Sequence, residues 1–217
     1  GVSKTTTAVN MSSILVEKGY KVLLIDLDPQ GNATENLGLN PEELSNTIYQ
    51  VLAKDLPLYE AIHETKFGID IIPANTELAY AEIALANKLS RDKILSNAIG
   101  SVDLAYDFVI LDLPPNLGLV SINGLVASDR VIITVDVGVF SLTGISDLMA
   151  LIGLIKNQLN PKLDVLGVLM TRVDNRTNLA KNIKKILETS LGSMVFNTQI
   201  RQNVAIAESQ INNKPIN

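Results

Sequence analysis

Residues 23–34 read LLIDLDPQGNAT, and this stretch is the most informative in the chain. Its apolar start belongs to a run, Val22–Leu27, that is typical of a buried parallel strand covered on both faces. Asp26 and Asp28 close the run, two residues apart, so that both side chains are expected on one face of the strand end. Carboxylates at the carboxyl end of a parallel strand lie where α/β sheets bind ligands. The stretch therefore predicts an α/β fold with a ligand site at this strand end.

The rest of the chain alternates between short apolar runs and longer helical patterns, which indicates βαβ units. Further strands are expected at Ile69–Pro73, Phe108–Leu113, Val131–Val137, Val165–Met170 and Met194–Thr198. Helices are expected at Thr5–Lys18, Glu77–Lys88, Asp92–Val102, Leu142–Gln158 and Leu179–Leu191. We predict an α/β protein with a doubly wound, mostly parallel sheet that is flanked by helices.

Residues 1–217 are expected to form a single domain, because no repeat, low-complexity tract or linker interrupts them. The chain opens on a glycine-containing loop before a helix, and such a loop needs a preceding strand to orient it. The polar last residues stop without a closing element. We therefore expect a fragment that is truncated at both ends and lacks a first strand and a last helix.

The composition narrows the possible classes of function. The chain is 47% hydrophobic but only 4% aromatic, so its core is built from aliphatic side chains, as suits buried parallel strands. It has no cysteine, which excludes disulfides, thiolate zinc sites and cysteine-bound iron–sulfur clusters. No apolar run approaches the ~20 residues of a membrane-spanning helix. These features agree with a cytoplasmic protein.

The net charge of −5 is unevenly distributed along the chain. Residues 172–201 hold six basic and two acidic side chains, a net of +4, so the remainder carries −9. The basic residues are Arg172, Arg176, Lys181, Lys184, Lys185 and Arg201. A local patch of this kind is able to bind phosphates on an otherwise acidic protein, although many such stretches are only solvated helix faces.

Residues 1–6 read GVSKTT and resemble the end of a Walker A loop, G-x-x-x-x-G-K-[ST]. Backbone N–H groups and a helix N-terminus bind phosphates in such a loop. Lys4 would then reach the β- and γ-phosphates, and the Thr5 hydroxyl would bind Mg²⁺. Ser3 departs from the motif, which has glycine at that position. A serine helix cap followed by a solvated lysine is the alternative interpretation.

A third segment, Phe108–Leu113, also runs from apolar residues into an acid, Asp112, and Pro114 and Pro115 follow it. This pattern is typical of a Walker B strand, whose aspartate lies near Mg²⁺ and usually contacts it through water. Apolar runs that end in aspartate are common, so the prediction of a nucleotide site depends on the combination of all three segments.

Together these motifs resemble the ParA/MinD/Soj family of deviant-Walker ATPases. The family's loop reads K-G-G-V-G-K-T-T, its next strand ends in D-x-D-P-Q-G-N-A-T, and its Walker B acid is followed by Pro-Pro. The similarity continues through residues 117–123 and 174–179 and into residues 200–216. Residues 28–34, which read DPQGNAT, indicate the ParA branch rather than MinD.

The resemblance implies a role for each matching position. Lys4 matches the Walker A lysine, Asp28 matches the acid that positions or activates the attacking water, and both are expected to be catalytic. Thr5, Asp26 and Asp112 match the groups around Mg²⁺. The positions expected to bind ATP or ADP are Gly1, Val2, Ser3, Lys4, Thr5, Thr6, Thr171, Arg172, Asp174 and Asn203. The family's signature lysine would lie two residues before Gly1, outside this sequence.

The resemblance also implies a functional cycle. ATP joins two copies into a homodimer, the dimer binds non-specific DNA, and a ParB-like or other adaptor protein stimulates an otherwise weak hydrolysis. The ATPase thereby positions a plasmid, a chromosome or other cargo, in the cytoplasm and at the nucleoid. The expected DNA contacts are Arg176, Lys181, Lys184, Lys185 and Arg201.

Two other functions stay open at this point. A MinD-like, membrane-associated positioning ATPase would need a C-terminal amphipathic helix. A nucleotide-binding homologue with little hydrolysis would follow if Ser3, in place of the loop glycine, slowed turnover. An electron-donating ATPase of the nitrogenase iron protein type is excluded, because the chain has no cysteine to hold its cluster.

Overall fold

The computed structural model describes residues 3–102, 105–137 and 142–216 of the chain. The chain divides into two compact units. The larger unit comprises Thr5–Ser128 and Glu208–Asn217, and the smaller unit comprises Gly1–Lys4 and Asp129–Ala207. Each unit contains a sheet whose strand pairs are mainly parallel and are linked by helices, which confirms the predicted α/β class. A single domain over the whole chain stays a prediction.

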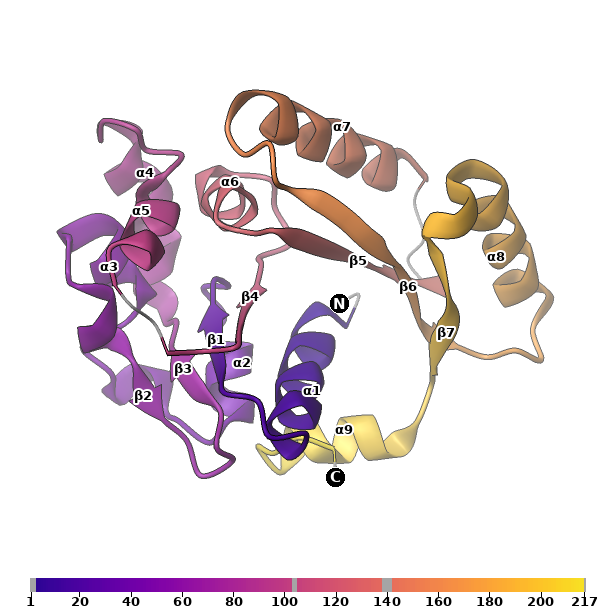
Figure 1. Ribbon diagram of the computed structural model, residues 1–217. Helices are drawn as coiled ribbons and strands as arrows, with labels where there is room; N and C mark the ends of the chain where they lie inside the picture. Colours follow the sequence, from indigo (N-terminus) through magenta and orange to yellow (C-terminus); the bar gives the residue numbers. More distant parts are fainter. Residues whose placement is uncertain (1–2, 103–104, 138–141, 217) are drawn as a thin grey trace. The chain divides into compact units, whose positions relative to one another are not determined.

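The sheet of the larger unit has the strand order β2-β3-β1-β4 (Figure 1). Strand β1, Val22–Asp26, is parallel to β3, Asp70–Ile72, on one side and to β4, Phe108–Asp112, on the other. The short strand β2, His63–Glu64, is antiparallel to β3. Because β1 and β4 are parallel and in register, both strands end in an aspartate at the same edge of the sheet.

Strand β1 is buried on both faces because successive side chains point to opposite sides of the sheet. Leu23 and Ile25 pack into one apolar cluster with residues of the helices between 48 and 120. Leu24 packs into a second cluster with Ala8 and Val9 of the first helix. The continuous apolar run in the sequence is thus explained by a helical layer on each face.

The α-helices of the larger unit include the expected first helix and three others, α2, α3 and α6, that the sequence did not predict (Figure 1). They are α1 Lys4–Glu17, α2 Asn32–Asn36, α3 Ile48–Lys54, α4 Ala81–Ala86, α5 Ile94–Gly100 and α6 Leu119–Val126. Short 3-10 helices lie at Pro41–Glu43, Leu58–Ala61 and Thr76–Tyr80. Helix α3 begins with a capping box, in which the Thr47 hydroxyl accepts from the Tyr49 amide and the Gln50 side chain accepts from the Thr47 amide.

The smaller unit has a parallel sheet of order β5-β6-β7. Its strands are β5 Arg130–Asp136, β6 Asp164–Val173 and β7 Val195–Arg201. Helix α7, Leu142–Gln158, connects β5 to β6, and helix α8, Asn178–Leu191, followed by a 3-10 turn at Gly192–Met194, connects β6 to β7. Helix α9, Val204–Ile211, follows β7.

Several sequence predictions differ from the structure in detail. The expected helix Glu77–Lys88 is a 3-10 helix followed by the short α4, and the expected helix Asp92–Val102 is reduced to α5. Strand β4 is less buried than its apolar sequence indicates, since Phe108 is 41% exposed. The reason is that β4 lies at an edge of its sheet. Among the described residues, no helix is long and apolar enough to cross a membrane.

Candidate functional site

Two buried carboxylates lie next to each other where β1 and β4 end. Asp26 and Asp112 are register partners on these parallel strands, and both side chains are almost completely buried. The pairing continues by one residue, since the Leu27 amide donates to the Asp112 carbonyl over 2.9 Å. The structure therefore brings together the two acids that the separate motifs predicted near Mg²⁺, at the edge where α/β sheets bind ligands.

The Asp26 carboxylate organises the turn that follows β1. Its Oδ1 accepts a hydrogen bond from the Asp28 amide over 3.1 Å. Its Oδ2 accepts from both the amide and the hydroxyl of Thr34, over 3.0 and 2.8 Å. The Thr34 hydroxyl in turn accepts from the Ala74 amide, beyond the end of β3, over 3.0 Å. Asp26 thus connects β1 to the start of α2 and, through Thr34, to the residues after β3.

Burial decides the protonation of Asp26. Desolvation of the carboxylate raises the pKa of Asp26 to about 6, although the hydrogen bonds from Asp28 and Thr34 lower it and so offset part of the shift. The negative charge of neighbouring Asp28 adds a smaller increase. The pKa of Asp26 is therefore closer to neutral pH than the pKa of an ordinary aspartate.

Asp28 lies in the turn and is partly exposed, in contrast to Asp26. Strand β1 ends at Asp26, so the strand alternation expected to place both side chains on one face does not extend to Asp28. The Asp28 Oδ1 accepts from the Gln30 amide over 3.0 Å, and its carbonyl accepts from the Gly31 amide. Gly31 has a φ of +62°, and a Cβ there would lie 3.0 Å from the Ala74 carbonyl oxygen. Glycine is therefore required in this turn.

The residues of the Walker-like loop lie at the start of α1. Gly1 and Val2 lie outside the described residues, and α1 begins at Lys4. Thr5 and Thr6 occupy its first turn, where backbone N–H groups have no intrahelical acceptor. Ser3 has a φ of +63°, in the left-handed region that glycine enters without steric cost. The backbone thus has the conformation that the motif's glycine serves, although this chain has serine there.

A second group of predicted residues lies in the last residues of β6 or just after the carboxyl ends of β6 and β7. Thr171 is buried, is the register partner of Asp136, and donates from its hydroxyl to the Val135 carbonyl over 3.3 Å. Arg172 has a φ of +54° and donates from Nη1 to Oδ2 of Asp136 over 3.1 Å. The Asp136 side chain is 1% exposed, whereas that of Arg172 is 51% exposed. This ion pair therefore joins a surface guanidinium to a buried carboxylate.

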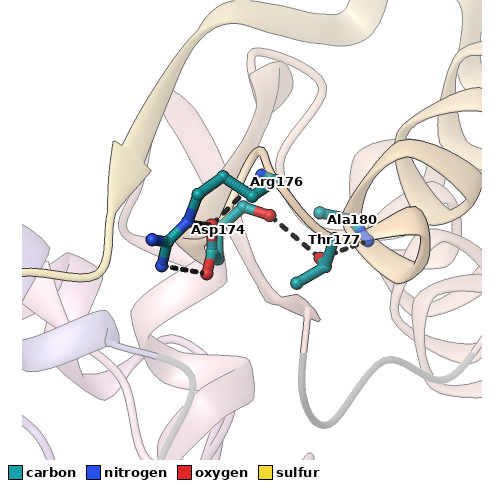
Figure 2. A network of polar contacts seen from close by, with 4 residues as sticks. All are labelled: Asp174, Arg176, Thr177 and Ala180. Atoms are coloured by element: carbon teal, nitrogen blue, oxygen red, sulfur yellow. Dashed lines mark hydrogen bonds and ion pairs between the residues drawn. The ribbon is translucent and has the colours of Figure 1, made fainter.

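Asp174 and Arg176 form a local ion pair in the turn before α8 (Figure 2). Asp174 Oδ1 accepts from both the Arg176 amide and Nε, and Oδ2 accepts from Nη2 over 2.8 Å. These hydrogen bonds lower the pKa of Asp174 to about 2. The Asp174 carbonyl accepts from the Thr177 hydroxyl, which also caps α8 by accepting from the Ala180 amide. Asp174 thereby fixes the entry to α8.

The predicted tail residues lie beside this turn. Val173 pairs with Arg201 at the end of β7, and the Gln202 amide donates to the Val173 carbonyl over 3.3 Å. Asn203 follows and is exposed, and its Oδ1 accepts from the Ala205 amide over 3.0 Å. The structure therefore brings residues 171–174 and 201–203 to one edge of the sheet of the smaller unit, as expected if both segments contact one base.

The predicted basic face of α8 is formed in part. Lys181 and Lys185 are exposed, on the side opposite much of the apolar face made by Ala180, Ile183 and Leu187. Lys184 is half-buried and lies 3.7 Å from the Glu188 carboxylate. Lys184 and Arg176 are both paired with acids of this chain, and of these two only Arg176 is highly exposed, at 90% of its side chain. Lys181 and Lys185 are exposed on α8 as well.

The donor set at the end of β1 and β4 fits Mg²⁺. No group of three or more acidic or histidine side chains that could hold a metal ion is present among the described residues. Magnesium is typically bound by one or two carboxylates together with substrate phosphates and water, rather than by a full protein cage. Asp112 suits this role. Three hydrogen bonds from the chain already bind Asp26, which anchors the turn, and its role near Mg²⁺ stays a prediction.

Two functional contacts were missed in the sequence. Thr34 was included only as part of the DPQGNAT match, yet it is the direct partner of Asp26. Asp136 lies inside the expected strand Val131–Val137 and receives no role from the sequence, yet it pairs with Arg172. An acid next to the carboxyl end of an apolar run, the same signal that identified Asp26 and Asp112, could have found Asp136.

The fold is that of a P-loop nucleoside triphosphatase, and known proteins support this class. A family model described as an AAA domain matches residues 1–165. The chain is 40% identical to the sporulation initiation inhibitor protein Soj of Bacillus subtilis, over the whole chain and 86% of Soj. It is 37% identical to the chromosome partitioning protein ParA of Myxococcus xanthus, over the whole chain and 77% of that protein.

A solved structure gives the same result for the fold. Cobyrinic acid a,c-diamide synthase from Mycobacterium smegmatis, with bound ADP and magnesium, superposes with a TM-score of 0.89 and is 33% identical. The match covers 98% of this chain and 86% of that one. These matches show that the chain belongs to the ParA/MinD superfamily of P-loop ATPases.

Proposed function

We propose that this protein is an ATP-dependent switch that binds ATP with Mg²⁺, hydrolyses it slowly and uses the cycle to position DNA or another cargo. The observation that supports this most is the adjacent placement of Asp26 and Asp112 at the carboxyl ends of two paired parallel strands. A turn ordered by Asp26 follows directly and carries Asp28. Phosphoryl-transfer sites need this combination of a metal-shell acid and a group that orients water.

The proposal assigns roles to individual residues. Lys4 binds the β- and γ-phosphates, and the amides at the start of α1 contribute to the phosphate site. Thr5 and Asp112 hold Mg²⁺, which neutralises charge on the phosphates. Asp28, partly exposed and held by its own turn, positions or activates the attacking water. Residues 171–174 and Asn203 bind the adenine.

The cargo side of the proposal rests on relatives and on charge. Soj and the Myxococcus protein are named for sporulation control and chromosome partitioning. The basic patch of α8 supports binding of non-specific DNA, since it offers charges without a pattern that reads bases. A homodimer formed with ATP would double the patch, and a ParB-like adaptor would stimulate hydrolysis and release. Such a switch works in the cytoplasm, at the nucleoid.

Calorimetric titration with ATP and Mg²⁺ tests the nucleotide site. Lys4→Ala should abolish measurable binding, because the phosphates lose their main cationic partner. Lys18→Ala is the matched control, since Lys18 is an exposed lysine just beyond the other end of α1 and should leave the affinity unchanged. Equal affinity in the Lys4→Ala variant and the unaltered protein would refute the assignment.

A second function is favoured by the backbone of Ser3. Its positive φ places a side chain on a loop position that suits glycine, which would strain or crowd the phosphate site. The protein would then bind nucleotide and turn it over very little, acting as a nucleotide-dependent binding module. Single-turnover hydrolysis distinguishes the two functions, since a module of this kind would hold ATP intact over hours.

A further inference from the structure

The N-terminus of α6 has an unusual cap. The helix starts at Leu119, and its N-cap residue Gly118 has no side chain to accept hydrogen bonds. The first amides of a helix have no acceptor within the helix and need one from elsewhere. Glu82 of α4 supplies it: Oε2 accepts from the Leu119 amide over 3.0 Å, and Oε1 is 3.4 Å from the Val120 amide. A carboxylate at a helix N-terminus is also favoured by the helix dipole.

The absence of a side chain at Gly118 leaves room for the Glu82 carboxylate. The Gly118 φ of −82° is available to any residue, so the backbone conformation does not require glycine. The position of Glu82 does depend on glycine, because a Cβ on Gly118 would clash with Oε1 and Cδ of Glu82 and displace the carboxylate. The close approach of the carboxylate to the helix start therefore depends on a missing side chain.

A second contact holds the same helix. Asn123 is buried in the middle of α6 and donates from Nδ2 to the carbonyls of Arg91 and Leu119. Its Oδ1 accepts from the Leu95 amide at the start of α5. The stretch from α4 to α5 thus holds α6 at two points, one of which is its first turn.

The loop that follows the Walker B acid ends at the start of α6, so the position of this helix start limits where the loop can lie. Residues 113–118 connect Asp112, at the carboxyl end of β4, directly to the first residue of α6. Pro114 and Pro115 restrict this loop, and the Ser121 hydroxyl donates to the Asn116 carbonyl and draws the loop toward α6. One end of the loop is fixed by strand pairing of Asp112 with Asp26, and the other end is fixed by Glu82.

We infer that Glu82 is a positioning residue for ATP hydrolysis, which acts by holding loop 113–118 in place beside Asp112. The inference rests on the proposed function, since the loop matters only if phosphates and Mg²⁺ bind at this strand end. Glu82 contacts the Leu119 and Val120 amides and acts on the reaction through them. Loss of the carboxylate frees the loop without removing any group that binds the nucleotide.

The test compares Glu82→Ala, Glu82→Gln and the matched control Glu77→Gln. Glu77 is an exposed acid on the preceding turn whose Oε2 accepts from the Gln50 side chain, so its replacement removes the same charge elsewhere. Glu82→Ala should speed amide hydrogen exchange at Leu119 and Val120 and lower kcat by about tenfold or more, because small misplacements in an active site are costly. KM for ATP should change little. Glu82→Gln keeps an acceptor and should recover part of kcat, and Glu77→Gln should match the unaltered protein.

A double-mutant cycle keeps the inference falsifiable if a single variant fails to fold. Gly118→Ala should displace Glu82 and lower kcat in the same way. In a Glu82→Ala background the added methyl group has room, so Gly118→Ala should then have little further effect. Faster exchange at Leu119 and Val120 with unchanged kcat would overturn the inference, as would additive effects in the cycle. If Lys4→Ala still hydrolyses ATP, the proposed function itself fails, which is a distinct result.

Discussion

Arg172 donates a hydrogen bond to Asp136 and so ties an exposed guanidinium to a carboxylate that is 1% exposed. Replacement of Arg172 by Ala removes a hydrogen-bonded positive charge from the buried Asp136 carboxylate. We expect the free energy of unfolding to fall by about 1–2 kcal/mol, a small value because Arg172 is half-exposed and solvent screens the pair. Arg172→Gly loses the same contact but relieves the positive φ, so it should be about 1 kcal/mol less damaging than Arg172→Ala. Urea denaturation measures both. Equal stability of the two variants would contradict the role given to the backbone.

The Thr34 hydroxyl should matter more at high pH than at low pH. Burial raises the pKa of Asp26 to about 6, so the folded protein is stabilised at low pH, where Asp26 is protonated. This stabilisation is lost as the pH rises through 6 and the buried carboxylate ionises. Thr34 donates to the ionised carboxylate, and Thr34→Val raises the Asp26 pKa further. The cost of Thr34→Val should therefore be larger at pH 8 than at pH 5, by about 1 kcal/mol.

Denaturation at the two pH values measures this difference. Thr65→Val is the matched control, because the Thr65 hydroxyl donates to the Ile69 carbonyl, which does not titrate. Its cost should be the same at both pH values. A Thr34→Val cost that does not change between pH 5 and pH 8 would show that Asp26 is not ionising in this interval.

Asp28 should serve hydrolysis more than binding. Its carboxylate is partly exposed and its Oδ1 contacts only its own turn, so Asp28→Ala should leave the fold and the ATP affinity intact. Loss of a group that positions or activates water typically costs about 10²–10⁴-fold in rate. Single-turnover assays with labelled ATP give the rate, and sedimentation shows whether the variant accumulates as an ATP-bound dimer. Hydrolysis at the unaltered rate would exclude the role.

Ser3→Gly should both stabilise the protein and speed turnover. Ser3 and Ser90 share a left-handed backbone, with φ values of +63° and +50°, and glycine at either position relieves strain of about 1 kcal/mol. Only Ser3 lies in the Walker-like loop. Ser90→Gly is thus the control for strain alone, and it should raise Tm without changing kcat. If Ser3→Gly raises Tm and leaves kcat unchanged, the serine does not limit hydrolysis.

Replacement of Lys181, Lys184 and Lys185 by Glu should abolish DNA binding and spare ATP hydrolysis. Binding of the unaltered protein should need ATP, ignore sequence and fall with salt, with a log–log slope of about −0.9 per phosphate neutralised. Among single variants, Lys184→Glu should matter least, since Lys184 already pairs with Glu188. Three exposed lysines of the larger unit, Lys18, Lys54 and Lys66, give a control of equal charge change. The same loss of binding in that control would show a net-charge effect only.

The sequence predicts the features that depend on local order along the chain. Asp26 and Asp112 could be placed together because each closes an apolar run and parallel strands end at a common edge. Helix α8 could be placed because its apolar residues recur with helical spacing. Family similarity then supplied roles that spacing alone could not assign, such as the water-positioning role of Asp28.

The contacts that escaped prediction join residues far apart in the sequence. Thr34 meets Ala74 and Glu82 meets Leu119, and each pair is separated by more than thirty residues. Neither pair belongs to a periodic pattern, because each contact depends on how helices pack after the strands are aligned. The exposure of Phe108 has the same origin, since its position at a sheet edge is not encoded in its own apolar neighbours.

The close fit of Gly118 against Glu82 has an evolutionary consequence. A larger residue at position 118 must displace the carboxylate at position 82 from the start of α6, so the effect of a substitution at one position depends on the residue at the other. The two positions should therefore change together among descendants of this sequence, although Glu82 lies on α4 and Gly118 lies just before α6. A lineage that abandons the pair must find another acceptor for the Leu119 amide, and a serine, threonine or aspartate at position 118 would provide one locally.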